Sequence, residues 1–475
     1  MSKFSEKFKN AINRSKISLS QLSAVSGLDI TYISKMKSGE RICSDASKMK
    51  KLIDQLSLTP GEQYELLKLY KIARIGESNY RRYCLVKEII ESLGSVPQDM
   101  ISQTYNHDLG DFHSIYGQTA VNRIVKAVLE KETSRKNGRI RILAQFDYSF
   151  LYEVLPLICC SNKNLTIDHI FFLRTPGSPD SATYNLEAFR TILPLILTHE
   201  NYHPKYCYSD IEVTANNFDL LPYAVITSEY IVNISHDAGS ALMTRRPELL
   251  ELFNRLYDDR ENITIELASR LKTVKEMSFH YLGYSRSNDI KALFSTPSLG
   301  QYVDDETAFC YMRNDFQDKD LLVRTLREST AVSKVKSPLI TAYFTPDSIK
   351  SFLETGRMSE YPPHIYRPFD MSDRIIILNH MLTDLRNGTL SGYVLRQNGF
   401  KVPDNLIINT LDKSRLSVMY LSDSGEQVTI NISESSIVSA FTDFLSELKS
   451  DSDLVCSLPE TTALLEELMD GCLKA

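Results

Sequence analysis

Several common sequence features are missing from this chain of 475 residues, and each absence excludes a class of protein. A run of about 18 consecutive apolar residues does not occur, so no transmembrane helix is expected. Lys3, Lys7 and Lys9 are followed by no apolar run, so we also expect no signal peptide. Together these absences indicate a cytoplasmic protein, and a hydrophobic content of 43% is ordinary for a globular chain.

The eight cysteines do not form the pattern of a zinc site or of a disulfide framework. There is no Cys-x-x-Cys pair, and no cysteine stands near a histidine at zinc spacing. Cys159 and Cys160 are adjacent, which makes them poor disulfide partners, so we interpret them as small buried hydrophobic residues. A redox sensor built on one of the eight remains an alternative.

Sequence patterns of several enzyme classes are also absent. The chain has no Gly-x-x-x-x-Gly-Lys-Ser/Thr phosphate loop, no Gly-x-Gly-x-x-Gly and no Gly-x-Ser-x-Gly. His199 and His203 are four residues apart and could share one face of a helix, which leaves a metal site open. Because they stand at a predicted helix end before Pro204, we interpret them as a solvated or locally hydrogen-bonded pair. We therefore expect that the chain is not an enzyme and that it holds no metal or cofactor.

The segment from Ser18 to Gly27 carries the signals of a short helix that ends in a tight turn. Ser18 is a good N-cap residue. Gly27 falls where the chain must turn, and glycine reaches positive φ without a steric penalty. The apolar residues that follow the cap at helical spacing are expected to face inward: Leu19, Leu22 and Val25.

A second helix is predicted from Ile30 to about Lys37. Asp29 can cap its N-terminus, and Gly39 can close its C-terminus. Ile33 and Met36 are expected to point into the core. The other face of this helix then presents Ile30, Thr31, Tyr32 and Lys35.

With apolar stripes on both sides, this unit resembles the Cro/C1-type (Xre-like) helix-turn-helix domain over roughly Lys3 to Leu58. The resemblance rests on the pattern Ser-x-x-x-Leu-x-x-x-x-Gly-Leu-x-x-x-x-Ile-Ser-x-x-x-x-Gly from Ser18 to Gly39. Three residues depart from the family's usual ones. This chain has Leu19 where the family often has Gln, Ser23 where it usually has Ala, and Met36 where Trp is common. The first change removes a usual phosphate contact, for which the possible substitutes are Ser18, Ser20 and Gln21.

The resemblance implies that the second helix enters the major groove of double-stranded DNA. The residues expected to contact base edges and nearby backbone are Ile30, Thr31, Tyr32 and Lys35. The residues expected to hold phosphates are Lys37 and Arg41, with Ser18 or Ser20. Because such regulators usually read two half-sites, we expect a homodimer. A basic four-helix module that binds protein instead of DNA is the alternative.

Charge is divided unequally along the chain. Residues 1–75 contain 14 Lys and Arg against seven Asp and Glu, a net charge of about +7. The remaining residues contain 40 against 53, a net charge of about −13. This asymmetry is expected when only the N-terminal unit meets phosphates.

A connector, residues 59–94, and a linker, residues 95–120, are expected to follow the N-terminal domain, residues 1–58. Thr59-Pro60-Gly61-Glu62 is a capping box that starts a helix, and a second apolar stripe continues to Leu93. We favour dimerisation through this connector or through the body, with an intramolecular spacer as the alternative. The linker is interpreted as rich in loops because its composition is polar, with Pro97, Gly110 and Gly117.

Strands that alternate with helices predict an α/β body of two domains, residues 121–290 and 291–475. A hairpin and a helix over Tyr223–Tyr257 are matched by a similar series from Leu416 to Leu448, which suggests two related halves. The pair is loosely similar to phospholipase-D-like folds. We expect that family's His-x-Lys-x-x-x-x-Asp motif to be missing, so that the resemblance covers the fold only and implies no catalysis.

The sequence as a whole favours a DNA-binding transcriptional regulator of prokaryotic or phage type. Its acidic body would sense an unknown small-molecule or protein effector, or hold the dimer together. Two alternatives stay open: an enzyme whose DNA-binding head regulates its own operon, and a protein-interaction scaffold.

Overall fold

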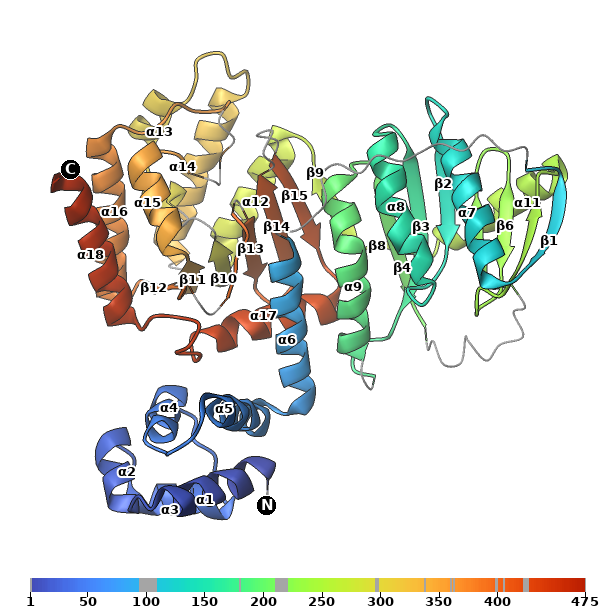
Figure 1. The fold of residues 1–475 in the computed structure, drawn as a ribbon. Helices are drawn as coiled ribbons and strands as arrows, with labels where there is room; N and C mark the ends of the chain where they lie inside the picture. The colour runs from blue at the N-terminus through green and yellow to red at the C-terminus, as the bar shows by residue number, and fades with distance from the viewer. Residues whose placement is uncertain are drawn as a thin grey trace.

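The computed structural model describes residues 2–93, 109–178, 181–209, 221–294, 299–336, 339–358, 361, 364–397, 400–404, 406–421 and 427–474. Figure 1 shows a small helical head, a long connecting helix and a larger body whose two halves lie side by side. This arrangement confirms the expected fold class, an all-α head followed by an α/β body.

The head consists of five helices, which are α1 Lys3–Ser15, α2 Leu19–Ser26, α3 Ile30–Ser38, α4 Ala46–Asp54 and α5 Pro60–Ile75. Their apolar faces form one core, in which the rings of Phe4 and Phe8 stack with centroids 5.4 Å apart. The core continues past the expected end at residue 58, because Leu66 and Tyr70 of α5 are buried in it. The capping box predicted at Thr59 and Glu62 starts α5 as expected.

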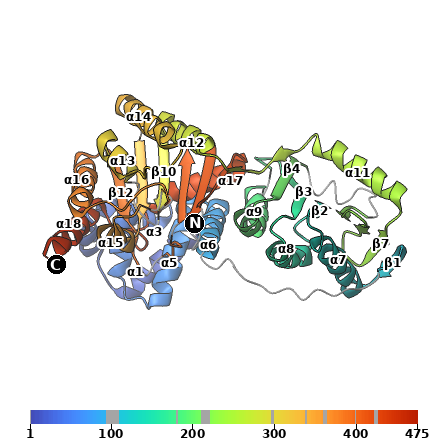
Figure 2. The same ribbon diagram turned by 90° about the horizontal axis from the view of Figure 1, so that it is seen from above.

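Helix α6, Glu77–Ser92, belongs to the body and not to the head. Its residues Tyr83, Val86 and Ile90 are buried in the main body core, and the Tyr83 ring lies 4.8 Å from that of Phe444. Figure 2 shows this helix beside α9, Ser181–Thr198, and α17, Ser435–Leu448. The apolar face expected to be available to a second subunit is therefore covered by the same chain, which corrects the expectation of dimerisation through α6.

The first half of the body is built on an eight-stranded sheet with the order β1-β7-β6-β5-β2-β3-β4-β8. Helices α7 Gln118–Thr133, α8 Ser149–Ser161 and α9 pack on one face, and α11 Pro247–Glu261 packs on the other. The strands are β1 Phe112–Tyr116, β2 Arg139–Leu143, β3 Thr166–Leu173, β4 Tyr202–Tyr208, β5 Tyr223–Ile226, β6 Ile231–Ile234, β7 Ser240–Thr244 and β8 Ile265–Glu266.

The second half is built on a seven-stranded sheet with the order β12-β11-β10-β13-β14-β15-β9. Its strands are β9 Ala268–Leu271, β10 Asp289–Phe294, β11 Leu339–Phe344, β12 Leu390–Val394, β13 Leu406–Leu411, β14 Arg415–Leu421 and β15 Gln427–Ile432. Helix α17 covers one face. The other α-helices of this half are α12 Val274–Arg286, α13 Asp305–Tyr311, α14 Lys319–Lys336, α15 Pro346–Thr355, α16 Met371–Asn387 and α18 Leu458–Lys474.

The two sheets have the same topology, which agrees with the expectation of two related halves. Reading β1-β7-β6-β5-β2-β3-β4 against β9-β15-β14-β13-β10-β11-β12 gives the same order, with parallel pairs at one end and antiparallel pairs at the other. This order matches β6 and β7 with β14 and β15. The sequence comparison had instead matched the hairpin β5–β6 with β14–β15, because β7 and β13 were not foreseen.

The described elements also differ from the expected boundaries. Strand β1 and the start of α7 lie inside the segment 95–120 that was interpreted as a linker, and the part of that segment before residue 109 is outside the described residues. The change from the first sheet to the second falls between Glu266 and Ala268, earlier than the expected boundary at residue 290. One continuous core joins α6, α9 and α17 across the two halves.

Candidate nucleic-acid interface

The helix-turn-helix is held by local hydrogen bonds at the predicted positions. Ser18 and Gln21 form a capping box at the start of α2, and Gly27 ends that helix with a φ of 66°. The Asp29 carboxylate accepts the backbone N–H of Thr31 at 2.7 Å and starts α3. These bonds lower the pKa of Asp29 below its ordinary value. Gly39 closes α3 with a φ of 87°.

The inner face of the motif is mostly as expected. Leu22, Ile33 and Met36 are fully buried in the head core. Val25 differs, because it is 45% exposed and the buried position at the end of α2 is taken by Ser26. The Ser26 hydroxyl donates to the carbonyl of Leu22 at 2.7 Å, so this polar side chain is satisfied inside the turn.

The outer face of α3 presents short side chains to solvent. Ile30 is 45% exposed, and Thr31 and Ser34 are exposed beside it. Ser34 was missed in the sequence interpretation, although its position four residues after Ile30 places it on the same helical face. In Figure 1, α3 lies on the side of the head that is turned away from the body. The body therefore does not cover this face.

The aromatic and cationic residues expected near DNA are partly engaged within the head. Tyr32 is half-buried, and its hydroxyl donates to the carbonyl of Ile42 at 3.1 Å, which differs from the expected place at a base edge. The guanidinium of Arg41 lies 5.8 Å from the centroid of the Tyr32 ring and is exposed. Lys37 donates to the Asn13 side chain at 2.9 Å. Lys35 has no ion-pair partner within the described residues.

The N-terminus of α2 forms a second polar edge beside α3. The hydroxyls of Ser18 and Ser20 are 3.0 Å apart, and the Gln21 side chain accepts the backbone N–H of Ser18 at 3.0 Å. All three side chains are exposed. A helix N-terminus with its backbone N–H groups directed outward favours a phosphate by hydrogen bonding and by the helix dipole.

Part of the positive charge of the head is neutralised by the body. Ion pairs join Lys50 to Asp453, Lys71 to Asp451 and Arg74 to Glu447. The Lys71–Asp451 pair is the most enclosed of the three, with side chains 18% and 14% exposed. Lys50 of α4 and Lys71 and Arg74 of α5 thus hold the head on the body.

The two histidines of the body do not share a helical face, the arrangement that had left a metal site open. The segment His199-Glu200-Asn201-Tyr202-His203 has the His-Glu-x-x-His spacing that binds zinc on a helix, but α9 ends at Thr198 and His203 lies on β4. His199 is buried, and its Nε2 is 2.7 Å from the carbonyl oxygen of Leu165. Within the described ranges, no group of three or more His, Cys, Asp or Glu side chains is placed to hold a metal ion.

The phospholipase-D-like pattern was expected to be missing, and that expectation is wrong. His203, Lys205 and Asp210 have the spacing His-x-Lys-x-x-x-x-Asp, once in the chain. His203 is paired in register with Asp168 of β3, and Lys205 forms an ion pair with Glu261 of α11. Asp210 lies outside the described residues.

The second sheet carries a row of polar side chains, in which Asn409 and Ser417 are buried, Asn431 is half-buried and Ser269 is exposed. Asn409, Ser417, Asn431 and Ser269 are neighbours in register across four strands, from β13 to β9. The side-chain oxygens of the first three have no hydrogen-bond partner among the described residues, and the same holds for Thr429 Oγ1. In the first sheet, the core face at the strands β5, β6 and β7 is apolar.

Comparisons with solved structures give distant likenesses, among them an archaeal chromatin protein and a bacterial enzyme. No protein-family model and no curated protein matches the chain. The archaeal chromatin protein TrmBL2, whose structure is described as showing a novel mode of DNA binding, is 10% identical, with 45% of this chain and 73% of that chain covered and a TM-score of 0.22. Phosphatidylserine synthase from Haemophilus influenzae is 10% identical, with 83% of this chain and 97% of that chain covered and a TM-score of 0.25.

The second likeness contradicts the expectation that the chain is not an enzyme, because an enzyme aligns with 83% of it, and we withdraw that expectation. At these TM-scores neither likeness identifies what this chain binds or does. In the part of the chain that the structure describes, every helix is too short or too polar to span a bilayer.

Proposed function

We propose that the chain is a sequence-specific DNA-binding transcriptional regulator of the Cro/C1 type, acting in the cytoplasm of a bacterium or on a phage genome. The observation that carries the proposal is the outer face of α3, where Ile30, Thr31 and Ser34 are exposed on the side of the head away from the body. A short capped helix with this kind of face fits the major groove.

The proposed contacts follow from this geometry. Thr31, Ser34 and Lys35 read base edges, with Ile30 as an apolar contact. Phosphates are held by Arg41 and Lys37, and by the N-terminus of α2 with Ser18, Ser20 and Gln21. Tyr32 positions Arg41 and the chain after α3, because its ring lies under the guanidinium and its hydroxyl is bonded to Ile42.

The proposal includes a homodimer and a body that senses an effector. Two heads whose recognition helices are spaced one helical turn of DNA apart match the two half-sites of a palindromic operator. We divide the chain into the head, the connector α6 and two α/β halves. The dimer contact is placed in the body, since the apolar face of α6 is buried within its own chain.

The experiment is fluorescence anisotropy on the DNA upstream of the chain's own gene, with a scrambled duplex as competitor. Thr31→Ala should weaken specific binding by about 1–3 kcal/mol per head and reduce the preference over scrambled DNA. The matched control is Lys163→Ala, an exposed change in the body that should leave both values unaltered. Equal binding of the two duplexes by the unmodified protein would exclude sequence-specific recognition.

A second candidate is an enzyme whose head regulates its own expression. It is favoured by the His203, Lys205 and Asp210 pattern on and after β4. The test is hydrolysis of bis(4-nitrophenyl) phosphate, a phosphodiester probe, by the full chain. The candidate predicts turnover that His203→Asn abolishes and Lys163→Ala preserves, and equal rates for both variants would remove it.

A further inference from the structure

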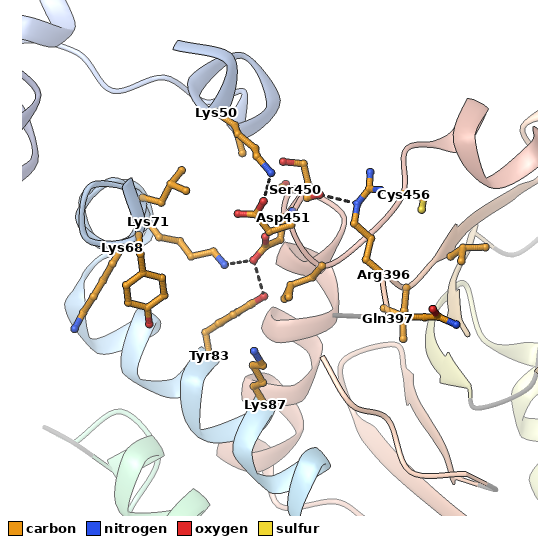
Figure 3. Close-up of a pocket in the computed structure, with 18 of the residues that line it drawn as sticks. Lys50, Lys68, Lys71, Tyr83, Lys87, Arg396, Gln397, Ser450, Asp451 and Cys456 are labelled. Carbon is orange, nitrogen blue, oxygen red and sulfur yellow. Dashed lines mark hydrogen bonds and ion pairs between the residues drawn. The ribbon is translucent and has the colours of Figure 1, made fainter. Parts of the chain in front are cut away.

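A cleft of about 910 Å³ lies where the head meets the body. Its walls come from α4, α5 and α6 on one side, and from α15, the end of β12, the segment Ser450–Cys456 and α18 on the other. Figure 3 shows Lys71 and Tyr83 on one side and Asp451 on the other directed toward one another, and Lys68 directed away from Asp451. We call this space the head–body cleft. Its volume lies within the range of small-molecule binding sites.

Positively charged side chains outnumber negatively charged ones in the lining of the head–body cleft. Seven of its lining side chains are Lys or Arg, and three are Asp or Glu. The Tyr83 hydroxyl donates to Asp451 at 3.3 Å, and Lys71 forms an ion pair with the same carboxylate. Lys50 forms an ion pair with Asp453. Two of the three carboxylates are thus matched one to one. Arg74 and Arg396 pair with Glu447 and Glu460, so the positive excess that remains lies on Lys68, Lys87 and Lys350 against Glu467.

That excess includes lysines from two different elements, α5 and α15, on opposite walls of the cleft. Lys68 of α5 and Lys350 of α15 are exposed, and neither has an ion-pair partner among the described residues. The Arg74 side chain is 14% exposed and paired with Glu447, so it is not part of that excess, although its Nε is buried without a hydrogen-bond acceptor among the described residues. Cations from separate elements around one space attract a ligand with several negative charges.

Aromatic side chains stand at the same walls. Tyr64 is 69% exposed and, with Tyr80, lines the cleft from α5 and α6. An exposed tyrosine ring offers a flat surface on which a planar base can stack. A ligand that combines several phosphate charges with a planar ring would use both features.

We propose that the head–body cleft binds a nucleoside di- or triphosphate, with Lys68 and Lys350 at its phosphates and Tyr64 at its base. Phosphate oxygens compete with Asp451 and Asp453 for Lys71 and Lys50, so the bound ligand loosens the ion pairs that hold the head on the body. The proposal does not require DNA, and its failure would leave the proposed function untouched.

The experiment is isothermal titration calorimetry on the full chain with two probes, ATP and inorganic triphosphate, at 0.15 M salt. The unmodified protein should bind both saturably, with ATP the tighter ligand. Lys68→Ala with Lys350→Ala should weaken both at least tenfold, because both lysines are exposed and their loss leaves the fold intact. Lys163→Ala, the matched control, should change neither by more than twofold.

Tyr64→Ala distinguishes the contribution of the base to binding from that of the phosphates. It should weaken ATP several-fold and leave triphosphate unchanged. Absence of saturable binding, or equal affinities in the double variant and the control, would overturn the site. If ATP and triphosphate bind with equal affinity and Tyr64→Ala changes neither, the assignment of a nucleotide ligand is overturned. The cleft would then be a phosphate-binding site only.

Discussion

The head and the body satisfy their buried polar groups in different ways. Among the described head residues, one buried side-chain nitrogen, Arg74 Nε at the contact with the body, lacks a partner, and Ser26 and Tyr70 both donate to nearby carbonyls. The second sheet buries Ser417, Thr429 and Asn431 without protein partners among the described residues. All nine histidines also stand at residue 107 or later. The head is therefore stabilised mainly by local hydrogen bonds. In the body, the free-energy cost of burying unpaired polar groups is offset by packing across the whole fold.

The largest effect should come from emptying either core. Phe8→Ala in the head and Phe441→Ala in the body remove rings that are 0% and 1% exposed, and each should cost about 3–5 kcal/mol. Hydrogen exchange followed by mass spectrometry should show that Phe8→Ala loses protection in α1–α5 alone. Loss of protection throughout the body in that variant would mean that the head is not a separate unit.

Acid should distinguish the two regions next. Burial lowers the pKa of His169 from 6.5 to about 4. Between these two pH values the unfolded chain binds a proton at His169 and the folded body does not. The stability that depends on neutral His169 is present above pH 6.5 and lost as the pH falls toward 4, on the order of 3 kcal/mol by the size of the shift.

Urea midpoints at pH 7 and pH 5 check this for the body, with His169→Gln as the variant that cannot titrate. The head has no histidine, and Arg14 lowers the pKa of Glu62 to about 2. Stability that depends on this carboxylate is lost only below pH 4.5, as the pH falls toward 2. A head that unfolds between pH 6.5 and 5 would contradict the contrast.

A smaller effect of opposite sign is expected from two hydroxyl deletions. Thr429→Val removes a buried hydroxyl without a partner while keeping the side-chain shape, and should stabilise the body by about 1 kcal/mol. Ser26→Ala removes a hydroxyl that is bonded to Leu22, and should destabilise the head by about 1 kcal/mol. Thermal unfolding measures both, and destabilisation by Thr429→Val would show that its hydroxyl has a partner in solution.

The smallest effect should come from the cap of α5. Thr59→Ala removes the side chain that accepts the Glu62 backbone N–H and should cost roughly 1 kcal/mol or less in the head. Thr59→Ser keeps the hydroxyl and is the matched control. Equal melting temperatures for the two variants would indicate that the tertiary contacts of α5 alone determine where it begins.

The same contrast explains what could be predicted from the sequence. Each end of α2 and α3 depends on a residue within a few positions, so Ser18, Gly27, Asp29 and Gly39 were found correctly. Val25 was placed wrongly because spacing alone did not distinguish it from its neighbour, a serine that satisfies its own hydroxyl.

The body depends on contacts that no local window contains. Strand β13 pairs with β10, more than a hundred residues earlier in the chain, and its apolar run did not reveal that partner. The head–body cleft could not be predicted either, because its lysines and carboxylates meet only after α6 docks between α9 and α17. Ser34 could have been found from helical spacing, since it follows Ile30 by one turn.

The most direct test of the account is the salt dependence of DNA binding by the unmodified chain and by Arg41→Ala. If Arg41 holds a phosphate beside the reading face of α3, the slope of log K against log salt should fall by about 0.9 per head in the variant. Lys163→Ala should keep the original slope. A slope unchanged by Arg41→Ala, or binding that does not depend on salt, would contradict the placement of DNA on this face.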